Sequence, residues 1–279
     1  MIIAICNQKG GVGKTTTAIN LSAGLATISM DKILLIDFDP QGNTTSGLGI
    51  DKNQIAGSVY EFLAGEAMET VVQSTKVSNL YILPANISLC GAEIELIEDE
   101  DREFKLHKRL KAEKHDFPLI IIDTPPSLGI LTINALVASD LVIIPIQTEF
   151  YALEGLVDFL NTLNLIKDRI NPKLDILGIL LTMADYRTRI AYDVEQELRQ
   201  KFNDLVFHTV IHRNVRLAEA PSYGSPIQIY APSSVGAYCY NRLAEEVKQR
   251  LRKRYGEGEK ERIGEGAISP DSSQTGIGT

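Results

Sequence analysis

Six apolar runs rich in Ile, Leu and Val recur along the chain. Their apolar residues are continuous and do not alternate with polar ones, so each run predicts a strand that is buried on both faces, as in a parallel sheet. The runs are Ile2–Cys6, Lys32–Asp37, Leu80–Pro84, Leu119–Asp123, Leu141–Ile146 and Asp175–Met183.

Segments with helical periodicity separate these runs. They are Thr15–Ala26, Gly91–Lys114, Ile130–Ala138, Ala152–Arg169, Arg189–Phe202 and Val235–Tyr255. Strand and helix alternate almost throughout, which predicts an α/β fold with a doubly wound, mostly parallel sheet flanked by helices. Ligands of such folds bind outside the carboxyl ends of the strands.

The length and composition indicate one globular domain. Of the 279 residues, 44% are hydrophobic and 23% are charged, the balance of an ordinary soluble protein. We expect the domain to span residues 1–255. Residues 256–279 are rich in Gly and Ser without apolar periodicity, so we expect a disordered tail.

Charge and cysteine content exclude several classes of protein. The net charge of −8 argues against a chain that coats nucleic acid over its whole surface, although 242–254 is locally basic. Three widely spaced cysteines suggest neither a disulfide framework nor a zinc or iron–sulfur site. Residues 1–7 lack a basic leader and no apolar stretch approaches ~20 residues, so we expect a cytoplasmic protein.

The stretch "QKGGVGKTTT", residues 8–17, follows the first predicted strand and opens the first predicted helix. A strand, a glycine-rich turn and a helix N-terminus place backbone N–H groups around an anion. Lys14 would reach the β- and γ-phosphates of a nucleotide, and the Thr15 hydroxyl would bind Mg²⁺. The usual pattern GxxxxGK[ST] requires Gly where this chain has Gln8, so "KGGVGKT" is the deviant form of the motif.

Carboxylates follow two of the predicted strands. Asp37 and Asp39 end "LLIDFD", and Asp123 ends "LIIID". An aspartate after a strand is often only a turn or helix cap. Three of them beside a phosphate loop favour a magnesium site, in which Asp123 would hold the ion through water or through Thr15.

The deviant loop resembles that of the ParA/MinD group of ATPases, and "QTEFYALEG", "LLTMADYRTR" and "VIHRNVRLAEAPSYG" resemble its ParA/Soj chromosome-partitioning branch. The resemblance runs from Ile2 to about Arg250. It implies that Lys9 crosses a two-fold interface to a nucleotide on a second copy, and that Asp39 holds the attacking water while Asp37 supports the magnesium site. The nucleotide-binding residues that it implies are Lys9, Gly10, Gly11, Val12, Gly13, Lys14, Thr15, Thr16, Met183, His212, Arg213 and Asn214.

Two of these expectations concern particular positions. Gly10 and Gly11 would let two loops meet face to face, because no side chain intervenes. His212 stands in "IHRN" where the family motif has "IPRN", in the segment that encloses adenine.

The resemblance implies a Mg²⁺-dependent enzyme that hydrolyses ATP to ADP. Bound ATP would join two subunits into a homodimer that binds double-stranded DNA without sequence preference, through Arg187 and Arg216. A ParB-like centromere-binding protein would stimulate hydrolysis and release the dimer, so we expect a nucleoid-associated protein. Arg189, Lys248, Arg250, Arg252 and Lys253 are further candidates for DNA contact.

Other functions remain to be weighed. A MinD-like ATPase that positions the septum would place the basic helix after Val235 on a membrane, but its thin apolar stripe of Leu243, Val247, Leu251 and Tyr255 favours packing on the sheet. A nitrogenase-reductase-like electron carrier needs bridging cysteines, and Cys90 has no suitably placed second one. A small-molecule kinase or synthetase would act without a dimer.

Overall fold

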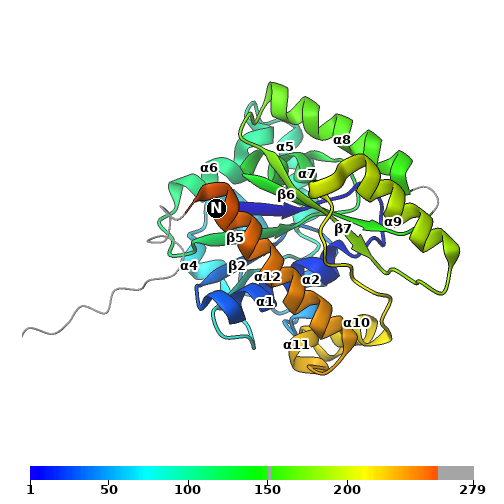
Figure 1. Cartoon of the computed structure of the whole chain (residues 1–279). Helices are drawn as coiled ribbons and strands as arrows, with labels where there is room; N and C mark the ends of the chain where they lie inside the picture. The colour runs from blue at the N-terminus through cyan, green and yellow to red at the C-terminus, as the bar shows by residue number, and fades with distance from the viewer. Residues whose placement is uncertain (150–151, 257–279) are drawn as a thin grey trace, which may run out of the picture.

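The computed structural model describes residues 1–149 and 152–256. Across these residues the chain forms one seven-stranded sheet with the order β3-β4-β2-β5-β1-β6-β7 (Figure 1). Only β3 is antiparallel to its neighbour within this sheet. The strands are β1 (Ile2–Ile5), β2 (Ile33–Asp37), β3 (Gln73–Ser74), β4 (Leu80–Leu83), β5 (Leu119–Asp123), β6 (Leu141–Gln147) and β7 (Asp175–Thr182).

Helices cover both faces of the sheet, which confirms the predicted fold class. The main helices are α1 (Lys14–Ser29), α2 (Asn43–Gly47), α3 (Val59–Ala64), α4 (Met68–Val71), α5 (Leu89–Ile97), α6 (Lys105–Ala112), α7 (Ile130–Ala138), α8 (Ala152–Arg169), α9 (Arg189–Phe202), α10 (Val215–Glu219), α11 (Ile227–Tyr230) and α12 (Val235–Tyr255). Short 3-10 helices are η1 (Arg102–Phe104), η2 (Asn203–Leu205) and η3 (Ala220–Tyr223).

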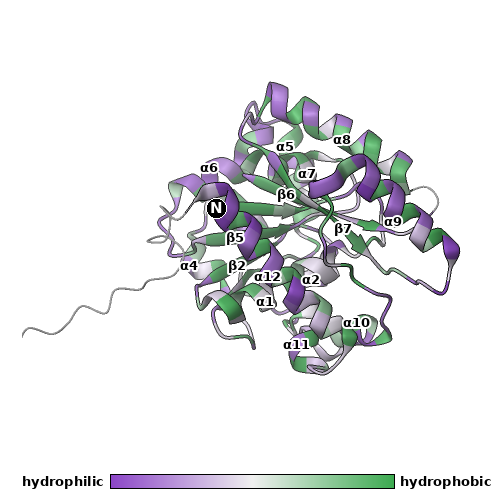
Figure 2. Ribbon diagram, viewed as in Figure 1, coloured by the Kyte–Doolittle hydropathy of each residue, from purple (hydrophilic) through white to green (hydrophobic). Residues whose placement is uncertain are grey.

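Each central strand contributes side chains to cores on both faces. In β2, Ile33 and Leu35 pack with α1 and α12, whereas Leu34 and Ile36 pack with α3, α5 and α7. Successive strand residues point to opposite faces, so a strand that is covered on both sides must be apolar throughout. Figure 2 shows the strands in green and much purple on the outer helices.

The register of the sheet brings several strand ends together. Ile5 of β1 and Asp37 of β2 both pair with Asp123 of β5. The loops that follow β1, β2 and β5 therefore leave the same edge of the sheet, where the candidate functional residues lie.

Helix α12 packs against α1 and crosses in front of the sheet (Figure 1). Leu243, Val247 and Leu251 are buried in the core, while Tyr255 is 39% exposed. The predicted packing of this helix on the sheet is confirmed, because the apolar side that a membrane would need is already covered.

The predicted helix over 91–114 is wrong as a single element. The chain forms α5, η1 and α6 instead. The break falls in the acidic run after Ile97, where an Asp99 side-chain oxygen accepts the backbone N–H of Asp101 at 2.9 Å and Asp99 pairs with Lys105. Local side-chain bonds of this kind compete with helical ones. Helical periodicity on both sides of the break concealed it.

The sequence prediction also missed β3 and the helices α2 to α4. A signal for α3 was present, since Ser58 and Glu61 form a capping box at its start. The predicted tail lies outside the described residues, apart from Gly256.

Candidate nucleotide-binding site

The loop between β1 and α1 is shaped to hold an anion. Gly11 and Gly13 have φ angles of +74° and +86°, the left-handed region that favours glycine. Gly13 is the N-cap of α1, and no side chain caps the helix there. The first N–H groups of α1 therefore remain directed at the loop, as in phosphate-binding sites.

A cavity of about 300 Å³ opens at this loop. It includes the loop itself, the start of α1 and residues that follow β2, β5 and β7, as the predicted convergence of strand ends requires. The lining residues are Gly10, Gly11, Gly13, Lys14, Thr15, Thr16, Asp39, Asn43, Thr124, Pro126 and Met183.

Lys14 is buried at the base of this loop, and its Nζ donates to the backbone oxygen of Lys9 at 3.1 Å. Burial lowers the pKa of Lys14, while the nearby Asp123 opposes that change. A buried ammonium with few partners favours an anion beside it, because it has lost most of its water.

Asp123 joins the loop to α2. Its Oδ2 accepts the hydroxyl of Thr15 at 2.8 Å and that of Thr44 at 2.6 Å. Its Oδ1 is buried without a hydrogen-bond partner in residues 1–149 and 152–256. Burial and the neighbouring Asp37 raise the pKa of Asp123 to about 7. The site therefore concentrates negative charge that a cation would relieve.

The other two carboxylates have different surroundings. Asp37 is fully buried, and its Oδ2 accepts both the backbone N–H and the hydroxyl of Thr45, at 2.8 and 2.7 Å. Burial raises its pKa to about 6. Asp39 lines the cavity, with Oδ1 accepting the N–H of Gln41 at 2.9 Å. Asp37 thus anchors α2, while Asp39 faces the cavity.

Lys9 lies on the outer side of the loop. Its Nζ is 2.9 Å from Glu149 Oε2, and its side chain is 50% exposed. Around Gly10, the nearest atom to an added Cβ would be Cβ of Pro126 at 3.6 Å, and around Gly11 nothing lies within 4 Å. A side chain at Gly10 would fit within this chain, so the contacts inside one chain do not explain why glycine is there.

Of the four residues predicted to enclose adenine, only Met183 lines the cavity at the loop. Met183 lines the cavity and is also contacted by Gln147, whose Nε2 lies 3.1 Å from its sulfur. Asn214 caps α10 by accepting the N–H of Arg216. The ring of His212 lies edge-on to that of Tyr186, with centroids 5.5 Å apart. His212, Arg213 and Asn214 are not among the residues that line the cavity at the loop.

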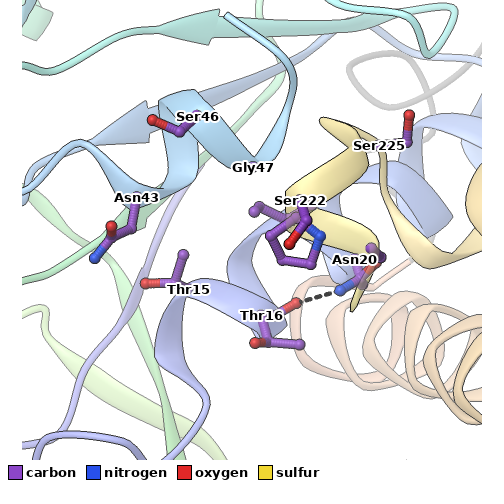
Figure 3. Close-up of a pocket in the computed structure, with 11 residues that line it drawn as sticks. Thr15, Thr16, Asn20, Asn43, Ser46, Gly47, Ser222 and Ser225 are labelled. Carbon is purple, nitrogen blue, oxygen red and sulfur yellow. Dashed lines mark hydrogen bonds between the residues drawn. The ribbon is translucent and has the colours of Figure 1, made fainter. Parts of the chain in front are cut away.

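A neighbouring cavity of about 350 Å³ shares Thr15, Thr16 and Asn43 with the first one (Figure 3). It lies between α1, α2 and η3, and Asn20 there donates to the backbone oxygen of Thr16 at 2.7 Å. No functional role was predicted from the sequence for the residues of its far wall. That wall is formed by Ala220, Pro221, Ser222 and Ser225.

Comparison with known proteins places this site in a family. A family model described as an AAA domain matches residues 1–176. The sporulation initiation inhibitor protein Soj of Bacillus subtilis (strain 168) is 54% identical over 247 residues, which cover 88% of this chain and 97% of that protein. The chain belongs to the Soj/ParA family. The resemblance inferred from the sequence is thereby confirmed.

Two other proteins extend this result. This Soj/ParA-family chain is 50% identical over 249 residues to the chromosome-partitioning ATPase Soj of Thermus thermophilus. The match covers 89% of this chain and 96% of that protein. A solved structure of cobyrinic acid a,c-diamide synthase from Mycobacterium smegmatis, with bound ATP analog and magnesium, superposes with a TM-score of 0.78 at 35% identity. The match covers 91% of this chain and 96% of that one.

The two arginines predicted to contact DNA are on the surface of this Soj/ParA-family chain. The side chain of Arg187 is 85% exposed and that of Arg216 is 59% exposed. They come from adjoining segments, since the N–H of Ala184 donates to the oxygen of Ile211 and the N–H of Arg213 donates to that of Ala184. The fold therefore brings together residues that are distant in the sequence.

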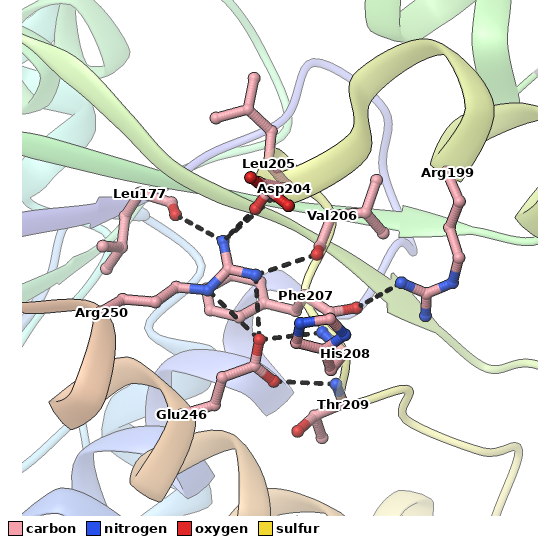
Figure 4. Close-up of polar contacts among 10 residues, drawn as sticks. All are labelled: Leu177, Arg199, Asp204, Leu205, Val206, Phe207, His208, Thr209, Glu246 and Arg250. Atoms are coloured by element: carbon pink, nitrogen blue, oxygen red, sulfur yellow. Dashed lines mark hydrogen bonds and ion pairs between the residues drawn. The ribbon is translucent and has the colours of Figure 1, made fainter. Parts of the chain in front are cut away.

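Arg250 is not a free surface cation, so its candidacy for DNA contact is wrong (Figure 4). Its guanidinium donates to Glu246 and to the backbone oxygens of Leu177, Asp204, Leu205 and Val206, and it stacks over the ring of Phe207 at 4.1 Å. These bonds consume its donors. The residue ties α12 to β7 and η2.

No group of three or more His, Cys, Asp or Glu side chains within 1–149 and 152–256 is arranged to hold a metal ion. Over the same residues, no helix is sufficiently long and apolar to span a membrane.

Proposed function

We propose that this chain is a Mg²⁺-dependent ATPase of the DNA-partitioning type, which hydrolyses ATP to ADP and phosphate. The observation that carries the proposal is the open loop at the start of α1, with buried Lys14 at its base and Asp39 facing the same cavity. The relatives named as Soj and ParA partitioning proteins support its assignment as a partitioning ATPase.

The residues present fit a magnesium ion. The orphaned Oδ1 of Asp123 is a buried acceptor, and the Thr15 hydroxyl that now bonds to Oδ2 lies beside the phosphate loop. We infer that Thr15 and Asp123 hold the ion, with Asp37 supporting the site by fixing α2. When bound, the ion would neutralise charge on the phosphates.

Several residues that line the cavity have separate roles in the proposed reaction. The N–H groups of the loop and Thr16 bind the phosphates, and the Lys14 ammonium offsets the charge that develops on the transferred group. Asp39 orients a water for in-line attack on the γ-phosphate. Met183 contacts the nucleoside, with His212, Arg213 and Asn214 closing the base pocket from the neighbouring segment.

We further propose that ATP joins two chains. Lys9 would leave Glu149 and reach the nucleotide of the second chain, where it acts as a cation supplied in trans. The bare surface at Gly10 and Gly11 supports a close approach of the two loops.

The paired chains would bind double-stranded DNA without sequence preference through Arg187 and Arg216. Two weak basic patches on one dimer bind cooperatively, and the affinity falls steeply with salt. A ParB-like partner at a centromere-like site would stimulate hydrolysis and release the dimer. The protein would then be cytoplasmic and associated with the nucleoid.

A second candidate function follows from the likeness to cobyrinic acid a,c-diamide synthase, whose structure has a bound ATP analog. An enzyme of that kind would turn over ATP without a dimer and without DNA. A MinD-like role on membrane is less well supported, because the apolar side of α12 is buried in the core. Liposome flotation and DNA retention, both with ATP, would separate these functions.

A gel shift of arbitrary duplex DNA tests the proposal most directly. The wild-type chain should shift the DNA with ATP and not with ADP. A Lys9→Ala variant should fail with either nucleotide, and Arg187→Glu or Arg216→Glu should also abolish the shift. An equal shift with ATP and ADP would contradict the proposed cycle.

A further inference from the structure

Each of the two arginines assigned to DNA has an acidic partner in its own chain. Arg187 donates two hydrogen bonds to Asp185, from Nε to Oδ1 at 2.7 Å and from Nη2 to Oδ2 at 2.5 Å. A bidentate pair of this kind fixes the orientation of the guanidinium relative to the carboxylate as well as bringing their charges together. Asp185 is held further because its Oδ1 also accepts the N–H of Arg187.

The second pair is built into the surface in the same way. Arg216 Nη1 donates to Glu219 Oε2 at 2.9 Å, and the hydroxyl of Tyr230 donates to the same oxygen at 3.0 Å. The ring of Tyr230 stacks on that of Tyr223, with centroids 4.7 Å apart. Glu219 is therefore held in place by two donors and is not a freely rotating surface carboxylate.

In both pairs the cation lies further out than the acid. Asp185 is 20% exposed under an arginine that is 85% exposed, and Glu219 is 38% exposed beside one that is 59% exposed. A guanidinium has five N–H donors, and Asp185 takes two of them, so a phosphate can approach the rest from outside. The arginines can therefore bind DNA while the acids still reduce the net charge that DNA meets.

Both acids stay charged at working pH. The bond from Arg187 lowers the pKa of Asp185 to about 2, and the bonds from Tyr230 and Arg216 lower the pKa of Glu219 below its usual range. The charge of each arginine is thus permanently opposed, in a chain that already carries a net charge of −8.

We propose that Asp185 and Glu219 limit the affinity for DNA, so that the patch on one chain is too weak to hold a duplex and only two patches together bind it. The inference rests on the proposed function. Its physical basis is that an arginine already paired with an acid releases fewer counterions from DNA, so the patch on one chain binds weakly. A dimer adds the small binding free energies of its two patches. The two acids would thereby make DNA binding depend on ATP.

The test measures duplex DNA binding by fluorescence anisotropy across a salt series, with ADP and with ATP. The variants are Asp185→Asn, Glu219→Gln and the two combined. Asn keeps the oxygen that accepts the backbone N–H of Arg187, so the local turn is preserved. We expect roughly twofold to fivefold tighter binding from each change, a steeper salt dependence, and measurable binding of the double variant with ADP.

Glu197→Gln is the matched control. Glu197 pairs with Lys201 at 2.7 Å on α9, so the substitution removes one negative charge and one surface ion pair without touching either arginine. Circular dichroism would confirm that every variant is folded. The control should bind DNA as the wild type does, because net charge alone is not the proposed cause.

The outcomes separate the inference from the function beneath it. If the wild type binds DNA with ATP and the two acid variants behave like Glu197→Gln, the inference is wrong and the proposed function stands. Weaker binding by the variants would also overturn it, since the acids would then serve to position the guanidinium groups. If neither the wild type nor any variant binds DNA, both the function and the inference fail.

Discussion

The phosphate loop carries two lysines whose surroundings are opposite. Lys14 is buried, faces the cavity and has lost most of its water. Lys9 is half exposed, is not among the residues that line that cavity, and pairs with Glu149. In the proposed function, the inner side of the loop would bind nucleotide within one chain, and the outer side would contact a second chain. The comparison predicts that nucleotide binding and dimer formation depend on separate residues, which can be altered one at a time.

Replacing Lys14 should have the largest effect, because it removes the inner cation. We expect Lys14→Ala to lower ATP turnover by about 1000-fold, the upper range for loss of one group that stabilises developing charge. Steady-state phosphate release measures this. Lys32→Ala, a half-exposed lysine whose nearest acid is 3.9 Å away, is the control and should keep full activity.

Replacing Lys9 should separate the two sides of the loop. We expect Lys9→Ala to bind nucleotide as the wild type does, yet to lose the ATP-dependent dimer and about 100-fold in turnover. Sedimentation velocity and phosphate release give the two readouts. Glu149→Gln keeps the lysine and should stay within a few-fold of wild type. Stable dimers of Lys9→Ala with normal turnover would remove the basis of the comparison.

A similar contrast distinguishes Arg250 from the exposed arginines. Arg250→Ala should cost about 2–3 kcal/mol in the free energy of unfolding, because Glu246 and the part-buried carbonyl oxygens of Leu177 and Val206 lose their donor. Urea unfolding measures this. Arg252→Ala, on the exposed side of α12, should change stability by less than about 0.5 kcal/mol. Unchanged stability of Arg250→Ala would contradict its role as a tie.

A further expected effect concerns pH in the absence of magnesium. The folded-state pKa values of Asp37 and Asp123 are raised to about 6 and 7, so the folded state binds protons that the unfolded state releases. Stability should therefore fall as the pH rises from about 4 to 7. Thermal unfolding in EDTA measures this, and Asp123→Asn should flatten the profile. A stability that rises over this range would contradict the assignment.

Much of the site could be predicted from the sequence because its signals are local. The loop, Lys14, Thr15 and the three aspartates follow strands whose burial is written in continuous apolar runs. Arg250 shows where this reasoning fails. Most of its sequence neighbours are basic or polar, whereas the carbonyl oxygens that bind it come from 177 and 204–206. No feature of the α12 sequence indicates that these carbonyl oxygens lie beside Arg250.

The sequence by itself determined six of the seven strands in the described residues, the phosphate loop and the family, because apolar periodicity and glycine spacing act over a few residues. Only the tertiary structure decided which charges are free. Glu149 reaches Lys9 from 140 positions away in the chain, and Asp123 meets Thr15 across the register of two strands. Long-range contacts set burial and pairing, and these decide whether a charged side chain supports the fold or faces a ligand.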